Sequence, residues 1–237
     1  MSGPDRRAEI SAGLADVRER IESACRAAGR SPEEVTLVVV TKFFPASDVE
    51  LLADLGVTDV GENRHQEAQS KAAECADLPL TWHYIGGLQS NKASAVAGYA
   101  DVVESVDRAK LVRGLARGAA ERGAGPLRCL VQVNLDPPDA GGGRSGVDPD
   151  QLADLAELVA TTPELELGGL MAVAPLGEDP GDAFGRLADL RAQFLVEHPE
   201  ARVLSAGMTG DLEEAIRHGA THVRVGRAVL GERPTVK

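Results

Sequence analysis

The stretch Thr36-Leu37-Val38-Val39-Val40 gives the clearest indication of the fold, because it is a run of mostly β-branched residues without polar alternation. A strand that is apolar on both faces is typical of a parallel sheet, whose two sides are both covered. Before it, residues 4–29 place apolar side chains at three- and four-residue steps, which predicts an amphipathic helix that ends near Gly29. A helix followed by a buried strand indicates the beginning of an α/β fold.

The alternation of strands and helices continues along the chain. Strands are predicted at residues 35–41, 59–62, 81–85, 102–106, 128–134, 168–173, 202–205 and 222–225. Eight strands alternating with helices favour a closed (β/α)8 TIM barrel with an extra N-terminal helix. The alternative is an open doubly wound sheet, which the lack of a G-x-G-x-x-G segment after the first strand disfavours. A length of 237 residues suits one barrel, so we expect a single domain over 1–237 and no second domain.

Composition argues against several classes of function. The net charge of −12 repels phosphate backbones, and an aromatic content of 3% leaves few platforms for stacked bases, so nucleic acid is not an expected partner. No apolar run is long enough to span a membrane, and the N-terminus lacks the pattern of a signal peptide. Three widely separated cysteines fit buried thiols in a reducing cytoplasm better than a disulfide framework or a metal site.

Lys42 is the first candidate functional residue, because it stands at the carboxyl end of the first predicted strand with two phenylalanines after it. Apolar surroundings in the mouth of a barrel disfavour the ammonium ion and make the amine a nucleophile toward an aldehyde. The alternative is a lysine whose side chain extends to solvent. Asn63, after the second strand, offers a donor and an acceptor to a ligand, or caps the next helix. His83 alternates with Trp82 and Tyr84, and without a partner at i+4 it indicates a structural histidine rather than a metal ligand.

The strongest local signal lies near the C-terminus. The seventh predicted strand runs into Ser205-Ala206-Gly207-Met208-Thr209-Gly210-Asp211, and the eighth ends in Arg224-Val225-Gly226-Arg227. Glycines allow a close approach of the backbone, and Asp211 with Glu214 predicts a capping box at the start of a helix. Such loops after strands seven and eight of a barrel are typical of a phosphate site, although two ordinary tight turns are the alternative. Because strand eight closes against strand one, the phosphate site and Lys42 predict a phosphorylated aldehyde as ligand: pyridoxal 5′-phosphate (PLP), or a sugar phosphate in a Schiff-base aldolase.

A set of short motifs extends over nearly the whole chain. In order, they are Val40-Thr41-Lys42, Gly61-Glu62-Asn63, His83-Tyr84-Ile85-Gly86, Gln89-Ser90-Asn91-Lys92, Gly169-Leu170-Met171, Ser205-Ala206-Gly207-Met208-Thr209, Asp211-Leu212 and Val223-Arg224-Val225-Gly226. In this combination the sequence resembles the PLP homeostasis protein family, also called the proline synthetase co-transcribed family. The resemblance implies a barrel like the N-terminal domain of alanine racemase, with PLP held as an internal aldimine on Lys42.

The resemblance also implies roles for other residues. Asn63 would line the PLP ring and Arg224 would face its pyridine nitrogen. The phosphate would be held by Ser205, the backbone of Gly207, Met208 and Thr209, and by Gly226 and Arg227. Four places depart from the family pattern. Members often have an aromatic residue in place of Arg64, Asp in place of Gly210, and Ser or Thr in place of Arg227, and many have Lys-Ser-Gly in place of Arg144-Ser145-Gly146.

Two hypotheses describe the function. In the first, the protein is a monomeric, cytoplasmic PLP carrier without robust catalysis, which buffers PLP, delivers it to PLP-dependent apoenzymes and affects amino-acid and keto-acid balance. In the second, it is a slow PLP-dependent racemase, whose second acid/base would be His83 or a residue of the glycine-rich loop 136–146. An arginine at the ring nitrogen does not give up its proton, which weakens the ring as an electron sink and favours the first hypothesis. A Schiff-base aldolase acting without PLP is the third interpretation.

Overall fold

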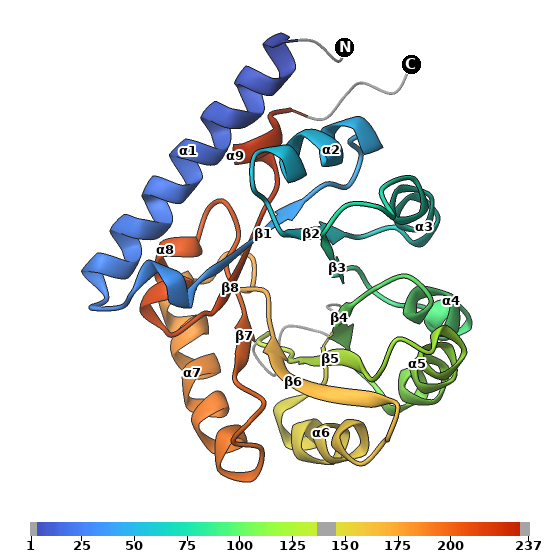
Figure 1. Ribbon diagram of the computed structural model, residues 1–237. Coiled ribbons are helices and arrows are strands. Elements are labelled where there is room, and N and C mark those ends of the chain that lie inside the picture. Colours follow the sequence, from blue (N-terminus) through green and yellow to red (C-terminus); the bar gives the residue numbers. More distant parts are fainter. Residues whose placement is uncertain (1–3, 137–145, 233–237) are drawn as a thin grey trace.

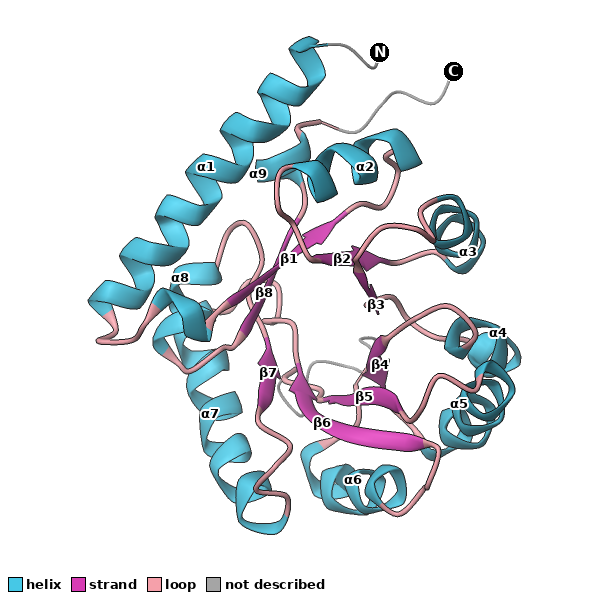
Figure 2. Cartoon of the chain, in the orientation of Figure 1, coloured by secondary structure: helices cyan, strands magenta, loops and turns pink. Residues whose placement is uncertain are grey.

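A closed barrel of parallel strands forms the centre of the molecule. The computed structural model describes residues 4–136 and 146–232 of the chain, and within these residues eight strands pair in chain order, with β8 returning to pair with β1 (Figure 2). The strands are β1 (Thr36–Val40), β2 (Asp59–Glu62), β3 (Thr81–Tyr84), β4 (Val102–Val106), β5 (Leu127–Gln132), β6 (Leu165–Met171), β7 (Val203–Ser205) and β8 (His222–Val225). The predicted barrel and its strands are therefore confirmed, and the open sheet is wrong.

Helices surround the barrel and cover the outer face of its strands (Figure 1). They are α1 (Pro4–Ala27), α2 (Ala46–Asp54), α3 (His65–Glu74), α4 (Ala93–Ala97), α5 (Ala109–Arg122), α6 (Leu152–Ala160), α7 (Pro180–Glu197), α8 (Leu212–Arg217) and α9 (Arg227–Leu230), with short 3₁₀ turns η1 (Pro32–Glu34), η2 (Ser90–Lys92) and η3 (Pro149–Gln151). Among the described segments, no helix is long and apolar enough to cross a membrane.

The extra N-terminal helix is confirmed as α1, which lies along α8 and α9 (Figure 1). Its apolar stripe is buried in one core cluster with side chains of β1 and β8. The approach to α9 is close at Gly13, where a Cβ atom would lie 2.6 Å from the carbonyl oxygen of Val229. The helix thus covers the junction at which the first and last strands of the barrel meet.

Alternation along each strand divides side chains between the barrel interior and the surrounding helices. Val39 of β1 belongs to the outer core under the helices. Val38 and Val40 point to the other face, toward Gly61, where a Cβ atom would lie 3.1 Å from Val38 Cγ1 and 3.6 Å from Val40 Cγ2. Continuing this alternation past the end of β1 assigns Lys42 to the interior face, at the carboxyl end of the barrel.

Candidate functional site

The carboxyl ends of β8 and β1 bring the two halves of the predicted site together. Val38 pairs with Arg224 in the sheet, and Gly226 follows so closely against β1 that a Cβ atom there would lie 3.1 Å from the carbonyl oxygen of Val40. The N–H of Arg224 donates to the carbonyl oxygen of Gly207 at 2.9 Å, which ties the loop after β7 to β8. The Lys42 end of β1, the β7 loop and the β8 turn therefore share one edge of the barrel, as predicted.

The turn that carries Lys42 has an unusual backbone. Lys42 is half-buried, and the next residue, Phe43, has φ 74°, in the left-handed region that non-glycine residues rarely adopt. Two contacts fix this turn from the side of β2 and α3. The N–H of Phe43 donates to Glu67 Oε1, and the guanidinium of Arg64 lies 4.6 Å from the centre of the Phe43 ring. Arg64, the departure from the family's aromatic residue, thus covers an aromatic ring beside Lys42.

Lys71, a buried lysine on α3, also contacts the turn that carries Lys42. The Lys71 ammonium group donates to the carbonyl oxygen of Thr41 and to the carboxylates of Glu62 and Glu67, each at 2.7 Å. Thr41 Oγ1 also donates to Glu62 Oε1 at 2.6 Å. Because Lys71 is only 5% exposed and Glu62 1%, this is a desolvated ion pair that acts directly on the peptide preceding Lys42.

Asn63 lies at the same edge, half-buried after β2, and its position depends on Gly86. A Cβ atom on residue 86 would lie 2.0 Å from Asn63 Oδ1 and 2.3 Å from its carbonyl oxygen. Only glycine leaves room for this contact. The helix-cap alternative for Asn63 is wrong, because α3 begins after Arg64 and no side chain caps it.

The loop after β7 is held at several points. Gly207 has φ 93°, and a Cβ atom there would lie 2.6 Å from the Cβ of Ala215, so the tight turn requires glycine. The N–H of Met208 donates to Asp211 Oδ1, and the carbonyl oxygen of Thr209 accepts from Arg20 of α1 at 2.8 Å. A loop amide in this turn therefore already binds an anionic oxygen, which is the chemistry that a phosphate group needs.

The capping box predicted for Asp211 and Glu214 is wrong. Asp211 is the N-cap residue of α8, but its side chain accepts from the Met208 amide in the loop and makes no cap hydrogen bond. Glu214 is paired with Arg217 one turn along the helix. The tight turn at Gly207 places the Met208 N–H within hydrogen-bond distance of the Asp211 carboxylate. The carboxylate therefore bonds to this loop amide and not to an amide of α8.

The remaining predicted phosphate residues differ in exposure. Arg227 is exposed as the first residue of α9, and Met208 is 40% exposed. Ser205 is fully buried, and its hydroxyl accepts from Arg224 at 2.7 Å and donates to Glu104 at 2.6 Å. The Ser205 hydroxyl thus belongs to a network inside the barrel, and its role toward phosphate stays a prediction.

That network continues through His83, which the structure confirms as a structural histidine. His83 Nδ1 lies 2.7 Å from Glu104 Oε1, and His83 Nε2 lies 3.0 Å from Asp59 Oδ1. Burial disfavours the imidazolium, but the hydrogen bonds to Asp59 and Glu104 outweigh it and raise the pKa of His83 to about 9. Both ring nitrogens of His83 are engaged and the residue is 3% exposed, which argues against the role of second acid/base that the racemase hypothesis gives it.

We predict that this histidine makes stability depend on pH. The pKa of His83 is raised on folding, so its contribution is fully present below the unfolded value of about 6.5 and is lost as pH rises through 9. The free energy of unfolding should fall by roughly 3 kcal/mol from pH 6 to pH 9 through this group. Denaturant unfolding at several pH values measures the loss, and ¹⁵N NMR of the imidazole assigns it. A neutral His83 ring at pH 7 would contradict the prediction.

Two buried charged residues, Glu104 and Lys71, were not singled out from the sequence. Glu104 is the one charged residue of the strand Val102–Val106, and an acidic residue in a predicted buried strand is a signal that it needs a charged partner. Lys71 gives no such signal, because its spacing from Glu67 is typical of a surface pair on a helix. The glycine-rich loop 136–146, which the racemase hypothesis names as a source of the second acid/base, lies for the most part outside the described residues.

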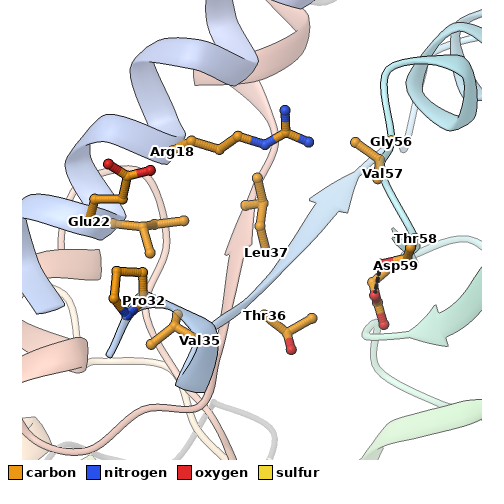
Figure 3. A pocket seen from close by; sticks show the side chains of 11 residues that line it. Arg18, Glu22, Pro32, Val35, Thr36, Leu37, Gly56, Val57, Thr58 and Asp59 are labelled. Atoms are coloured by element: carbon orange, nitrogen blue, oxygen red, sulfur yellow. Dashed lines mark hydrogen bonds between the residues drawn. The ribbon is translucent and has the colours of Figure 1, made fainter. Parts of the chain in front are cut away.

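A cavity of ≈ 320 Å³ lies at the other end of the barrel, where β1 and β2 begin. Figure 3 shows Asp59 and Thr58 on one side of it and Arg18 and Glu22 of α1 on the other. Thr58 Oγ1 donates to Asp59 Oδ2 at 2.6 Å, while Asp59 Oδ1 contacts His83. This cavity contains none of the predicted ligand residues, but it reaches the outer end of the buried network.

Comparisons with known proteins agree with this arrangement. The family model of the alanine racemase N-terminal domain matches residues 14–234. A pyridoxal phosphate homeostasis protein of Mycobacterium leprae is 42% identical over 241 residues, which cover 96% of this chain and 94% of the relative. PipY of Synechococcus elongatus, solved with PLP bound, has a TM-score of 0.80 and 34% identity over 94% of this chain and 100% of that chain.

The crystal structure of an unknown protein from Bifidobacterium adolescentis has a TM-score of 0.86 and 33% identity, over 97% of each chain. Sequence relatives and solved structures therefore match the same, nearly complete extent of the chain. The expected resemblance is confirmed: this chain belongs to the alanine racemase N-terminal domain family, and within it to the pyridoxal phosphate homeostasis proteins.

Proposed function

We propose that this protein binds PLP at the carboxyl end of its barrel and serves PLP homeostasis by carrying and buffering the cofactor. The observation that carries the proposal is the meeting of the Lys42 turn with the β7 loop and the β8 turn at one edge. The PLP bound to the relative PipY supports the choice of ligand.

The residues at this edge fit the chemical groups of PLP. The cofactor supplies a reactive aldehyde, toward which Lys42 offers an amine. Arg224, 4% exposed, offers donors to a ring nitrogen, and Asn63 offers an amide beside the ring. The glycine turns at Gly207 and Gly226 would let backbone amides approach a phosphate, with Arg227 nearby, and the Met208 N–H already donates to a carboxylate oxygen, Asp211 Oδ1.

The residues favour holding the cofactor over transforming a substrate. A racemase needs a second acid/base that reaches the opposite face of its substrate. The one histidine suggested for that work is enclosed between Asp59 and Glu104 inside the barrel. We therefore propose a carrier without robust catalysis, which acts as a monomer in the cytoplasm and passes PLP to PLP-dependent apoenzymes.

The test is the visible absorption spectrum of purified protein mixed with PLP. We expect a band above 400 nm for the wild type, which borohydride reduction shifts and fixes to the chain, and mass spectrometry should find the added mass on the peptide containing Lys42. The variant Lys42→Ala should lose at least 90% of this fixed label. Lys110→Ala, which removes an exposed lysine of α5, is the matched control and should keep it.

Absence of the band in the wild type would overturn the assignment of PLP. Label distributed over several lysines, unchanged in Lys42→Ala, would overturn the assignment of the site. Release of the cofactor to an apoenzyme, followed as regained activity of that enzyme, tests the carrier role. Exchange of the Cα hydrogen of amino acids no faster than with free PLP is expected, and rapid exchange would favour the racemase.

A further inference from the structure

A chain of hydrogen-bonded polar side chains, all buried except Asp59, crosses the interior of the barrel. It runs from Asp59 of β2 through His83 of β3, Glu104 of β4 and Ser205 of β7 to Arg224 of β8, with each neighbouring pair 2.6–3.0 Å apart. Its outer end, Asp59, borders the cavity in Figure 3. Its inner end is the arginine that the proposed function assigns to the ring nitrogen of PLP.

Glu104 is the centre of this chain and is completely buried. Its Oε1 faces the His83 ring, while its Oε2 accepts from Ser205 and lies 3.8 Å from a terminal nitrogen of Arg224. Burial favours the neutral acid, yet His83, Arg224 and Ser205 outweigh it and lower the pKa of Glu104 to about 2. One carboxylate thus stands between two buried cations.

Among the described residues, two carboxylates and one imidazole ring lie around His83. Asp59 faces it from β2 and Glu104 from β4, and the His222 ring of β8 lies 6.1 Å away. Burial lowers the pKa of His222, so this second ring is neutral beside the charged His83. The charges of the four ionised side chains, Asp59, His83, Glu104 and Arg224, therefore balance inside the barrel.

Both terminal nitrogens of the Arg224 guanidinium are held by groups outside β8. One terminal nitrogen donates to Ser205 at 2.7 Å, and the other donates to the carbonyl oxygen of Ala172, just after β6, at 2.8 Å. Ser205 in turn is oriented by Glu104. An arginine has rotamer freedom to lose, and a fixed network removes it before a ligand arrives.

We propose that Glu104, which is hydrogen-bonded to His83, is a positioning residue. Through Ser205 it fixes the side chain of Arg224, and its negative charge sets the electrostatic potential at the ring of bound PLP. This inference rests on the proposed function, because it concerns the same site. Removal of the carboxylate takes away the negative charge beside Arg224, and the added positive potential makes protonation of the bound chromophore harder. The chromophore of the altered protein should therefore lose its proton at a lower pH.

The experiment follows the visible absorbance of PLP-loaded protein against pH and the dissociation constant of PLP. For Glu104→Gln we expect the pH midpoint to fall by about one unit and the dissociation constant to rise about tenfold. Glu104→Asp, which keeps the charge, should return the midpoint toward the wild-type value. Glu121→Gln, on the exposed end of α5, is the matched charge control and should leave both quantities unchanged.

Asp59→Asn is a milder variant at the cavity end of the chain, and it should shift the midpoint in the same direction by a smaller amount. If Glu104→Gln does not accumulate as folded protein, the pH midpoint of Asp59→Asn tests the inference in its place. An unchanged midpoint in the folded variants overturns the inference, even if affinity falls, because that is what a purely structural role predicts. A wild type without PLP absorbance is the different result that overturns the proposed function.

Discussion

Replacing Lys71 with methionine is expected to lower the free energy of unfolding by about 3–5 kcal/mol, because it leaves a buried carboxylate without its cation. Lys71 is 5% exposed and binds Glu62, Glu67 and the carbonyl oxygen of Thr41. Glu62 is 1% exposed and has no access to water that could replace the ammonium group. Denaturant unfolding followed by circular dichroism measures the loss.

The same substitution should weaken PLP binding, because the left-handed turn at Phe43 loses one of the contacts that hold it. Two controls separate the causes. Lys110→Met removes an exposed lysine and should change stability by less than about 0.5 kcal/mol. The double variant Lys71→Met/Glu62→Met removes both charges and should recover part of the lost stability. A single Lys71→Met variant as stable as the wild type would refute the role of this ion pair.

Gly169→Ala is expected to cost about 4 kcal/mol, from backbone strain and a steric overlap together. Gly169 has φ 147°, and a Cβ atom there would lie 2.0 Å from the carbonyl oxygen of Val203, its partner on β7. The register of β5 against β6 shifts at this point, which is typical of a bulge. The obstacle is backbone within the sheet, so no side-chain movement relieves it.

Substitutions at two other glycines separate the backbone strain from the steric overlap. Gly177→Ala introduces a side chain at φ 84° where no atom lies within 4 Å, so it measures the conformational strain alone. Gly168→Ala meets mainly the flexible side chain of Arg128, so it measures a relievable overlap. Both should cost less than half of what Gly169→Ala costs in thermal or denaturant unfolding. Equal losses at all three positions would contradict the steric explanation.

The fold was predictable because its signal is repeated. Apolar strands and amphipathic helices alternate over the whole chain, so an error at one boundary, such as the start of β6 at Leu165 rather than 168, does not change the topology. The carboxyl-end position of Lys42, Asn63 and the β7 and β8 turns follows from strand order alone. These parts of the site needed no knowledge of side-chain contacts.

The supporting network was not predictable, because it depends on which residues meet across the barrel. Glu104 and Ser205 lie far apart along the chain, and no periodicity in the sequence relates Asp59 to His83. Lys71 resembles a surface residue until α3 is packed onto β2 and its ammonium group is enclosed. The capping box at Asp211 failed for a similar reason, since spacing indicates a possible hydrogen bond but does not exclude a nearer competing donor.

The close contact of Gly226 with Val40 has a consequence for the order of events during protein synthesis. The proposed amine follows the first strand to leave the ribosome, and the proposed phosphate turn follows the last, so the two parts of the proposed site come together only after the barrel has closed. We therefore expect the specific PLP site to form only in the closed barrel. Bound PLP would contact groups at the ends of both β1 and β8 and would therefore stabilise the closed barrel. Once the free PLP concentration exceeds the dissociation constant, the added free energy of unfolding would rise with the logarithm of that concentration.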